Sequence, residues 1–507
     1  MVARPLDDRQ SDPTSEVAPG ASPAHDSAAT EHPVDLDVRT GLFIGGRWVP
    51  GPPARIEVFD PTTERPLGSV PSGDTGAVDA AVEAAALALP GWSSTTVSER
   101  ADALDAIASA LEERAEHLSR AIACEVGSPL PFSRATQVGL PIAVTRAMAV
   151  AAREFAWEEP FDRALVVREP VGVVAAITPW NYPLHQVMAK VSAALVAGCT
   201  VVLKPSAEAP LTAFALADLV ANLGLPAGVL NVISGRGVVV GERLAAHPDV
   251  DLVSLTGSTA AGRRVMELAA ATVKRVTLEL GGKSATVVLD DVDLEGVVPD
   301  AVMQCFRNAG QNCSALSRLV VPRRWLPDVE RLAAEAASAV IVGDPLAEGT
   351  EMGPLISSEQ RGRVRELIHA GVDGGATLLV GGSDPPVGLD HGFFVRPTVF
   401  SRVTPAMRIA QEEIFGPVIS ILAYDGDDDA AVALANDSPY GLSGAVWSAD
   451  PSRAERVARR LRTGRVAING GRFNPRAPFG GYKGSGLGRE LGSYGLSEFL
   501  EVKTLQR

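Results

Sequence analysis

The sequence predicts an α/β fold in which parallel strands alternate with crossover helices. From residue 171 onward, short runs of β-branched residues are separated by segments rich in Ala and Leu, as in βαβ units. A second region of the same kind extends from 301 to about 448, which indicates a second α/β lobe. The runs expected to be strands of the first region are 171–177, 200–203, 230–233, 252–255 and 276–280.

Other elements frame these two regions. Apolar residues flank a Gly-Gly pair at 41–48, which is typical of a hairpin. Between 79 and 118, apolar residues recur at steps of three and four, as an amphipathic helical stretch requires. Within the second region, 409–422 is expected to form a loop and a strand, and 428–435 a helix.

Length and composition restrict the class of protein. A chain of 507 residues, 46% hydrophobic and 21% charged, has room for about three domains and should fold as a soluble protein. Because the net charge is -15, neither nucleic acid nor an anionic membrane is expected as a partner. No run reaches the roughly 18 apolar residues of a membrane span. The 4 cysteines are too few for a disulfide framework, which favours a reducing, cytoplasmic location.

Residues 1–40 are predicted to be a disordered acidic leader. They hold three arginines against eight acidic residues, with many Pro, Ser and Ala. Neither a basic start nor an apolar core indicates a targeting signal.

A nucleotide site has only weak local signals. No strand is followed by G-x-G-x-x-G, the common dinucleotide fingerprint. Gly235, Gly237 and Gly241 follow one strand, but a tight turn without any nucleotide is an alternative explanation for them. Gly257 and Ser258 follow another strand and open a helix, where free backbone N–H groups suit a pyrophosphate.

One cysteine differs from the other three. Cys313 is surrounded by glycine and amide residues, whereas Cys124, Cys199 and Cys305 lie among apolar residues and are expected to be packing residues. Cys313 is therefore the candidate nucleophile, although local sequence identifies no activating base. No metal-ligand spacing is found, so no metal is expected.

Two further positions are chemically unusual. Pro179 and Pro183 bracket Asn181 and fix its direction, as a hydrogen-bond donor at an active site requires. Glu279 ends an apolar strand, where burial would raise its pKa and make it a usable base. The alternative for the Asn181 segment is an ordinary turn, and the alternative for Glu279 is the end of a strand at the surface.

Taken in order, seven motifs resemble the aldehyde dehydrogenase superfamily, in its NAD(P)-dependent, non-acylating branch. The resemblance extends from Phe43 to the C-terminus. The motifs are Pro179-Trp180-Asn181-Tyr182-Pro183, Lys204-Pro205-Ser206, Thr256-Gly257-Ser258-Thr259, Glu279-Leu280-Gly281-Gly282-Lys283, Gly310-Gln311-Asn312-Cys313, Glu413-Ile414-Phe415-Gly416-Pro417-Val418 and Pro478-Phe479-Gly480-Gly481.

The resemblance implies oxidation of an aldehyde to a carboxylic acid. Cys313 would attack the aldehyde, and Asn181 with the Cys313 N–H would hold the oxyanion. Glu279 would activate the water that hydrolyses the thioester. Lys190 and Glu490 match positions that the family associates with proton relay. Because branches that transfer the acyl group to coenzyme A generally lack this glutamate, hydrolysis is favoured.

The resemblance also implies a variant Rossmann site for NAD or NADP. Lys204 would contact the adenosine ribose, Ser258 the pyrophosphate and Glu413 the nicotinamide ribose, with Phe415 beside it. Family members that prefer NAD commonly read Lys-Pro-Ser-Glu, but Ala207 stands at the glutamate position here, so dual cofactor use is expected. The other expected cofactor residues are Ile177, Thr178, Pro179, Trp180, Ser206, Ala207, Gly237, Gly257, Gly262, Leu280 and Gly281.

The substrate channel follows from the same resemblance. Its rim is expected at 469–477. Arg307, Arg472 and Arg476 leave an acidic semialdehyde open as the substrate, although exposed arginines are usually solvated. The residues expected to line the channel are Tyr182, His185, Gln186, Met188, Ala189, Phe306, Arg307, Asn312, Ser314 and Phe479.

The resemblance sets the expected domains. A nucleotide-binding domain is expected at 41–155 and 173–278 and a catalytic α/β domain at 279–480. A small β oligomerisation element is expected to combine 156–172 with the C-terminal segment 481–507, where exposed strand edges would make a homodimer or homotetramer. Two other functions stay open: an acylating dehydrogenase that uses coenzyme A or phosphate, and a non-catalytic member of the family.

Overall fold

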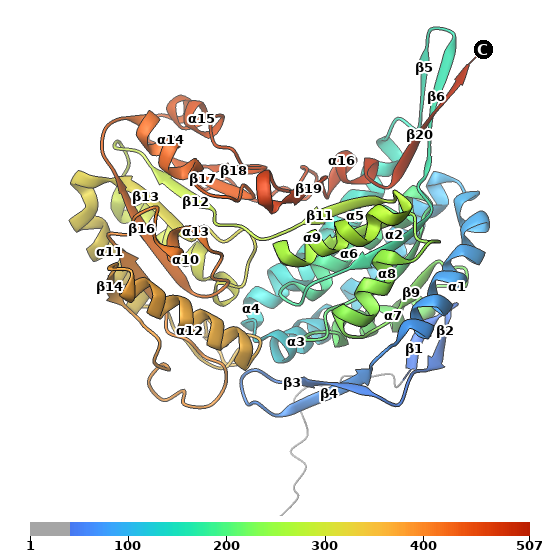
Figure 1. Ribbon diagram of the computed structural model, residues 1–507, viewed down its shortest axis with the longest axis horizontal. Helices are drawn as coiled ribbons and strands as arrows, with labels where there is room; N and C mark the ends of the chain where they lie inside the picture. Colours follow the sequence, from blue (N-terminus) through green and yellow to red (C-terminus); the bar gives the residue numbers. More distant parts are fainter. Residues whose placement is uncertain (1–40, 507) are drawn as a thin grey trace, which may run out of the picture. The chain divides into compact units, whose positions relative to one another are not determined.

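The computed structural model describes residues 41–506, so the predicted leader lies outside the described residues. Within them, the predicted α/β class is confirmed by two large mixed sheets (Figure 1). The first sheet has eight strands, in the spatial order β19 (Gly486–Leu487), β11 (Arg275–Glu279), β10 (Leu252–Thr256), β7 (Val173–Ile177), β8 (Thr200–Lys204), β9 (Leu230–Val232), β1 (Gly41–Ile44) and β2 (Arg47–Pro50).

The five central strands of this sheet are parallel, and all five predicted runs form them. Their β-branched side chains are buried on both faces, as a parallel sheet covered by helices requires. The associated helices and helical turns are α1 (Thr75–Ser93), α2 (Val97–Glu113), α3 (Ala115–Val126), α4 (Leu130–Phe132), η1 (Ser133–Val138), α5 (Gly139–Glu154), α6 (Pro183–Ala197), α7 (Leu211–Ala221), η2 (Gly237–Gly241), α8 (Glu242–Ala246), α9 (Thr259–Ala269), η3 (Ala270–Thr272) and α16 (Gly492–Ser497).

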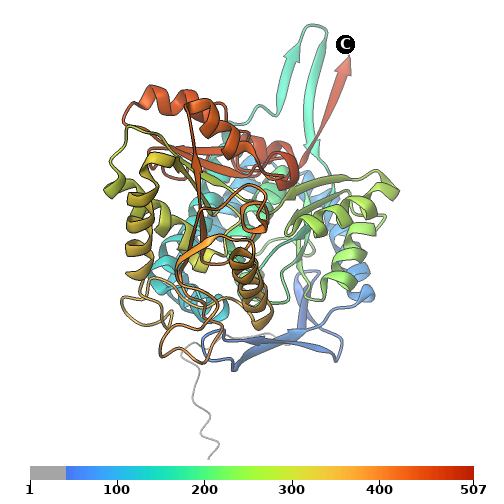
Figure 2. The same ribbon diagram turned by 60° about the vertical axis from the view of Figure 1, so that its left-hand side comes forward.

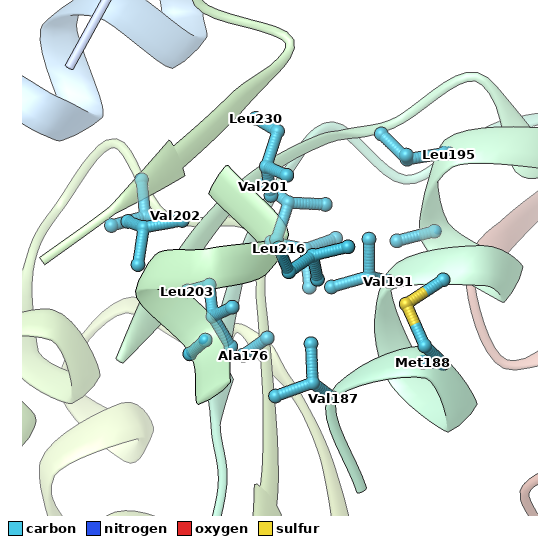
Figure 3. Close-up of a cluster of buried hydrophobic side chains, with 14 of the residues drawn as sticks. Ala176, Val187, Met188, Val191, Leu195, Val201, Val202, Leu203, Leu216 and Leu230 are labelled. Carbon is cyan, nitrogen blue, oxygen red and sulfur yellow. The ribbon is translucent and has the colours of Figure 1, made fainter. Parts of the chain in front are cut away.

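The core of the first sheet lies between its strands and helices α6 and α7. Figure 3 shows part of it, which includes Met188 and Val191 of α6 and Val201 and Leu203 of β8. Pro183 opens α6 at a position where its missing N–H costs nothing. Gly198 ends the helix in the left-handed conformation.

The second sheet has seven strands, and all of its pairs except β14 with β15 are parallel. Its order is β14 (Thr377–Val380), β15 (Thr398–Ser401), β16 (Val418–Tyr424), β13 (Arg318–Pro322), β12 (Ala285–Val288), β17 (Ser443–Trp447) and β18 (Arg465–Ile468). The associated helices and turns are α10 (Leu294–Phe306), η4 (Arg307–Gly310), η5 (Arg323–Trp325), α11 (Leu326–Ser338), α12 (Ser358–Asp373), α13 (Arg408–Gln411), α14 (Asp428–Asn436), α15 (Pro451–Ala458) and η6 (Lys483–Ser485).

Two smaller sheets complete the described chain. β5 (Glu158–Phe161), β6 (Ala164–Pro170) and β20 (Leu500–Gln506) form an antiparallel sheet, and both ribbon views show them extending together (Figures 1 and 2). β3 (Arg55–Phe59) pairs with β4 (Pro66–Pro71). Of the segment 481–507, residues Leu500–Gln506 join the three-stranded sheet, whereas β19 joins the eight-stranded one.

Local structure departs from expectation at two places. The stretch 79–118 is divided among three helices, and Thr96 and Glu99 form a capping box that starts the second of them. The start of 409–422 is the short helix α13 and not a loop.

One helical stretch, Leu130–Glu154, is long and apolar enough to span a membrane by length and composition, which differs from the expectation that no such segment exists. Half of its most apolar window is buried in the structure, and α5 packs on α2 and α6. Such burial is typical of a core helix.

Candidate active site

The carboxyl ends of four parallel strands bring polar groups to one edge of the first sheet. Ile177 is paired with Lys204, and Thr256 with Glu279, so the residues after these strands converge. The hydroxyls of Thr178 and Thr256 are buried and have no hydrogen-bond partner within residues 41–506. Unsatisfied buried polar groups are costly and indicate a site for a polar ligand. Thr256 stood in a quoted motif but was not predicted as a site residue.

Glu279 lies at this edge with only 3% of its surface exposed. Burial raises the pKa of Glu279 well above its usual range, and the negative charge of Glu490 raises it further. The nearby Cys313 thiol favours the charged form. However, neither carboxylate oxygen of Glu279 has a partner with hydrogen-bond geometry in the described chain, so we treat the thiol as a close neighbour and not as a bonded donor.

Cys313 follows a backbone segment in an unusual conformation. Asn308 and Ala309 both have a φ of 55°, and Gly310 has a φ of 71°. At Gly310 a Cβ atom would overlap the carbonyl oxygen of Gly416, so only glycine fits. The cysteine loop is thereby packed against the segment that carries Glu413 and Phe415.

The thiol of Cys313 is half-buried and near three carboxylates. Burial raises its pKa well above the usual range, and the charges of Glu279, Glu413 and Glu490 add to this shift. A thiol in such surroundings is protonated at rest, so its reaction requires a base. Of these carboxylates, Glu279 raises the pKa of the thiol most.

Asn181 is held by three other amide residues. Its side-chain nitrogen donates to the carbonyl of Gln311 at 3.0 Å. Its own carbonyl accepts from Gln137 at 2.9 Å and from Asn308 at 3.0 Å. Because an amide nitrogen carries two N–H groups, one remains to hold a ligand oxygen. Sequence reasoning did not identify Gln137 or Asn308.

Lys190 and Glu490, the two residues expected to relay protons, are in contact with each other. Lys190, on α6, is 1% exposed and forms an ion pair with Glu490. The backbone of Glu490 is paired in both directions with that of Phe479, which fixes its position. Both charges act on Glu279, where Lys190 lowers the pKa and Glu490 raises it.

The expected adenosine site combines a buried cation with an open helix end. Lys204 donates to the carbonyl of Pro205 at 2.8 Å, and burial lowers its pKa to about 8. Ser258 caps α9 by accepting from Ala261 N–H at 3.2 Å, and Ser258 and Ala260 are exposed. Gly237 is also exposed, and Ser206, Ala207 and Gly257 are half-buried.

Close packing explains two of the other expected cofactor residues. A Cβ at Gly262 would lie 2.8 Å from the side chain of Leu280, so glycine brings α9 against this loop. A Cβ at Gly281 would overlap the carboxylate of Glu413, whose Oε1 accepts from the N–H of Gly282 at 3.0 Å. Burial raises the pKa of Glu413 to about 7.

Phe415 and Trp180 join the two lobes beside this carboxylate. Their ring centroids are 5.4 Å apart and the rings are perpendicular. Phe415 has a φ of 58°, a conformation that bulky residues rarely adopt. Pro179, which precedes Trp180, is half-buried.

A cavity of about 810 Å³ opens beside Cys313. Seven predicted channel residues line it, but the prediction was wrong for Met188, which lies in the core of the first sheet (Figure 3). Ala189 and Phe306 are also core residues and do not line it. The predicted residues that line the cavity are Tyr182, His185, Gln186, Arg307, Asn312, Ser314 and Phe479.

His185 and five aromatic rings form part of the cavity wall. Burial lowers the pKa of His185 to about 4, so the imidazole is neutral at pH 7, and its Nδ1 has no partner in the described chain. The rings belong to Phe132, Tyr182, Trp447, Phe473 and Phe479.

The structure separates the arginines considered for the channel. Arg476 forms an ion pair with Glu154 at 2.8 Å and does not line the cavity. Arg307 and Arg472 do line it. Arg465, which the sequence did not single out, is a third arginine in the wall.

The remaining cysteines are buried and free. Burial raises the pKa of Cys124, Cys199 and Cys305 to about 12, as expected of packing residues. Among residues 41–506, no group of three or more His, Cys, Asp or Glu side chains could hold a metal ion.

Comparison with known proteins agrees with this geometry. A family model described as the aldehyde dehydrogenase family matches residues 48–505. A 3-succinoylsemialdehyde-pyridine dehydrogenase from a Pseudomonas species is 48% identical over 471 residues, which cover 92% of this chain and 98% of that protein.

Solved structures give the same result. A mutant of aldehyde dehydrogenase C from Pseudomonas syringae, crystallised with NAD+ and octanal, has a TM-score of 0.92 and 47% identity over 94% of this chain and 98% of that one. The Mycobacterium tuberculosis aldehyde dehydrogenase complexed with NAD+ has a TM-score of 0.90 and 43% identity over 92% and 98%. The chain therefore belongs to the aldehyde dehydrogenase family.

Proposed function

We propose that this protein oxidises an aldehyde to a carboxylic acid through a covalent intermediate on Cys313, with NAD+ as the electron acceptor. The observation that carries the proposal is the position of the Cys313 thiol, which lies in the wall of a large cavity and close to the unpaired carboxylate of Glu279. Family relatives crystallised with NAD+ support the choice of cofactor.

The residues at the sheet edge fit a dinucleotide. The unpartnered hydroxyls of Thr178 and Thr256, the open end of α9 and the buried ammonium of Lys204 are suited to a ribose and a pyrophosphate. Glu413 is positioned on the Gly281–Gly282 backbone to bind a second ribose. When bound, NAD+ supplies the electrophile that takes up a hydride.

The first half of the reaction forms the covalent intermediate. Glu279 removes the thiol proton of Cys313, because its carboxylate has no other partner in the described chain and its pKa is raised well above the usual range, which makes it a stronger base. The thiolate attacks the aldehyde carbon and forms a carbon–sulfur bond. The free N–H of Asn181 and the backbone N–H of Cys313 hold the resulting oxyanion. Loss of hydride from this carbon leaves a thioester.

The second half is hydrolysis. Once the thiol proton has passed from Glu279 to solvent, the carboxylate takes a proton from water, and the hydroxide attacks the thioester carbon and expels the Cys313 thiolate. The raised pKa of Glu279 makes it a base strong enough for this step. The two oxygens of the carboxylic acid come from the aldehyde and from water, so no coenzyme A is consumed.

Both NAD+ and NADP+ are proposed as cofactors. Ala207 is half-buried beside Lys204, and the next residue, Glu208, is exposed. Without a carboxylate at position 207, the repulsion that would exclude a 2′-phosphate is absent from that position.

The oligomeric state and location stay predictions. Phe161 is 72% exposed and Val502 is 63% exposed, and both lie on the sheet formed by β5, β6 and β20. Exposed apolar residues on a sheet edge support pairing with a second copy as a homodimer or homotetramer. The enzyme is expected to act in the cytoplasm on a small-molecule aldehyde, without nucleic acid or membrane.

The proposal is tested by following reduced cofactor in purified protein with a panel of aliphatic, aromatic and acidic aldehydes. The assay contains NAD+ or NADP+ and no coenzyme A. We expect oxidation that falls by at least about 10⁴-fold in Cys313→Ala, as loss of a nucleophile does, and is kept in the control Cys124→Ala. Turnover only after addition of coenzyme A would favour the acylating alternative. Silence in both conditions would favour a non-catalytic role.

A further inference from the structure

The cavity wall carries positive charge in a protein that is strongly negative overall. The chain has a formal charge of -15, yet three arginines and one aspartate line the cavity. The arginines are Arg307, Arg465 and Arg472, and the acid is Asp300. His185 adds no charge at pH 7 because its pKa is lowered to about 4. The wall is therefore a local site for an anion.

Arg465 is the best placed of these cations. It opens β18, and the alternate residues Arg465 and Ala467 both line the cavity, as the two-residue period of a strand requires. Its guanidinium lies over the ring of Phe473 at 5.3 Å. Within residues 41–506, the Arg465 side chain has no ion pair and no hydrogen bond.

A half-buried guanidinium without a carboxylate is energetically unusual. Burial lowers the pKa of Arg465, because removal from water disfavours its charged form. Five N–H donors are left without a protein acceptor. Two other half-buried arginines are paired with carboxylates: Arg453 with Asp428 and Asp290, and Arg168 with Glu159. Arg365 is also half-buried and its Nε has no partner in the described chain, but it does not line the cavity.

The single acid in the wall does not neutralise Arg465. Asp300 accepts from Gln304 at 2.8 Å, and both residues lie on one face of α10. Arg307 directly follows the end of α10, and both Arg307 and Arg472 are exposed. Both arginines also lack an ion pair among the described residues, so the charge on the wall stays positive.

Aromatic rings separate this charge from the reacting thiol. Phe473 lies between Arg465 and the rings of His185 and Phe479, at centroid distances of 6.5 and 6.1 Å. Phe473 and Cys313 pack against the same apolar cluster that contains Phe479. A ligand that reaches from Cys313 to Arg465 therefore needs an apolar body between its two ends.

We propose that the cavity takes aldehydes that carry a carboxylate at the end distant from the reacting carbon, and that Arg465 binds this carboxylate. The proposal rests on the oxidation of aldehydes proposed above and specifies the substrate class. The carboxylate supplies the acceptors that the guanidinium lacks, and the aromatic wall covers the chain between the two ends.

The test compares three aldehydes of one chain length: 8-oxooctanoate, its methyl ester and octanal. In the wild-type enzyme with NAD+, we expect kcat/KM for 8-oxooctanoate to exceed that of the other two by about ten- to a hundredfold, the effect of one charge-assisted hydrogen bond. This comparison needs no variant. Equal values for the acid and its ester would overturn the inference.

Variants then assign the preference to one residue. Arg465→Met is expected to abolish the advantage of 8-oxooctanoate through KM while kcat/KM for octanal stays within about threefold, and Arg465→Lys keeps part of it. The control Arg324→Met removes a cation that also lies over a ring, Trp325 at 5.5 Å, but outside the cavity. Equal losses for all three substrates in Arg465→Met would overturn the assignment.

The two proposals fail in different ways. If the wild type oxidises octanal but does not prefer 8-oxooctanoate, the inference fails and the proposed function stands. If the wild type oxidises no aldehyde of any class, the proposed function fails, and the inference fails with it.

Discussion

Lys190 of α6 and Glu490 of the C-terminal segment form a buried ion pair although 300 residues separate them in the sequence. Each charge acts on Glu279, and the two act in opposite directions. The pair therefore adjusts the base as well as joining two distant parts of the chain.

Removing the two charges singly is expected to shift the pH profile in opposite directions. Glu279 must be deprotonated to act, so activity is lost as the pH falls through its pKa. Glu490→Gln removes the charge that raises this pKa and should move the acidic limb of the kcat profile to lower pH. Lys190→Met removes the charge that lowers it and should move the limb to higher pH, each by about one unit.

The exposed pair Lys503 and Glu169 provides the control. Lys503→Met and Glu169→Gln change the net charge equally, and neither residue influences Glu279, so the pH profile should stay in place. Shifts in the same direction for Lys190→Met and Glu490→Gln would contradict the argument and would indicate loss of structure, since breaking a buried pair costs about 3–5 kcal/mol.

Cofactor choice is expected to depend on Ala207. The wild type should use NADP+ with a kcat/KM within about tenfold of that for NAD+. Ala207→Glu introduces a carboxylate beside Lys204, which should repel a 2′-phosphate and lower kcat/KM for NADP+ by at least about tenfold. A strong preference for NAD+ in the wild type would refute this reading. The control Ala207→Gln adds a side chain of the same size without the charge, and it should leave the ratio of kcat/KM for the two cofactors unchanged.

Gln137 is expected to position Asn181 through the backbone. It lies in the π-helical turn η1 and donates to the carbonyl of Asn181. Gln137→Leu leaves that carbonyl with Asn308 as its remaining donor, so Asn181 is held less firmly. We expect kcat to fall by about tenfold with little change in KM for NAD+. An equal loss of thermal stability and of both parameters would instead indicate a purely structural role.

Features of the fold that depend on neighbouring residues in the sequence were predicted better than features that depend on contacts between distant residues. All five strand runs of the first region are confirmed because local β-branched residues determine them. The division of 79–118 was missed although Thr96 and Glu99, a readable capping box, mark it. Met188 was misplaced because the channel was assigned from the family resemblance. Its spacing of three residues to Val191 and seven to Leu195 puts it on the core face of α6 (Figure 3).

The catalytic candidates could be found from motifs, but the cavity could not. Each of the three candidates has a local signal in the sequence. Glycine and amide residues surround Cys313, an apolar strand precedes Glu279, and two prolines bracket Asn181. Arg465 carries none, because its place in the wall depends on the pairing of β18 with β17, in which Arg465 lies opposite Ser443. Gln137 and Thr256 depend on similar tertiary contacts.

The conformation of the cysteine loop is expected to require Gly310. Gly310→Ala introduces a Cβ that overlaps the carbonyl oxygen of Gly416 at a residue with a φ of 71°. The combined strain should destabilise the protein by roughly 3 kcal/mol and lower its melting temperature. It should also lower kcat, because the displaced loop carries Cys313. The control Gly362→Ala lies within α12 with nothing near its Cβ, so alanine there should leave the melting temperature unchanged or raise it. Unchanged stability and kcat in Gly310→Ala would mean that the two loops move apart without cost and that their contact does not position the nucleophile.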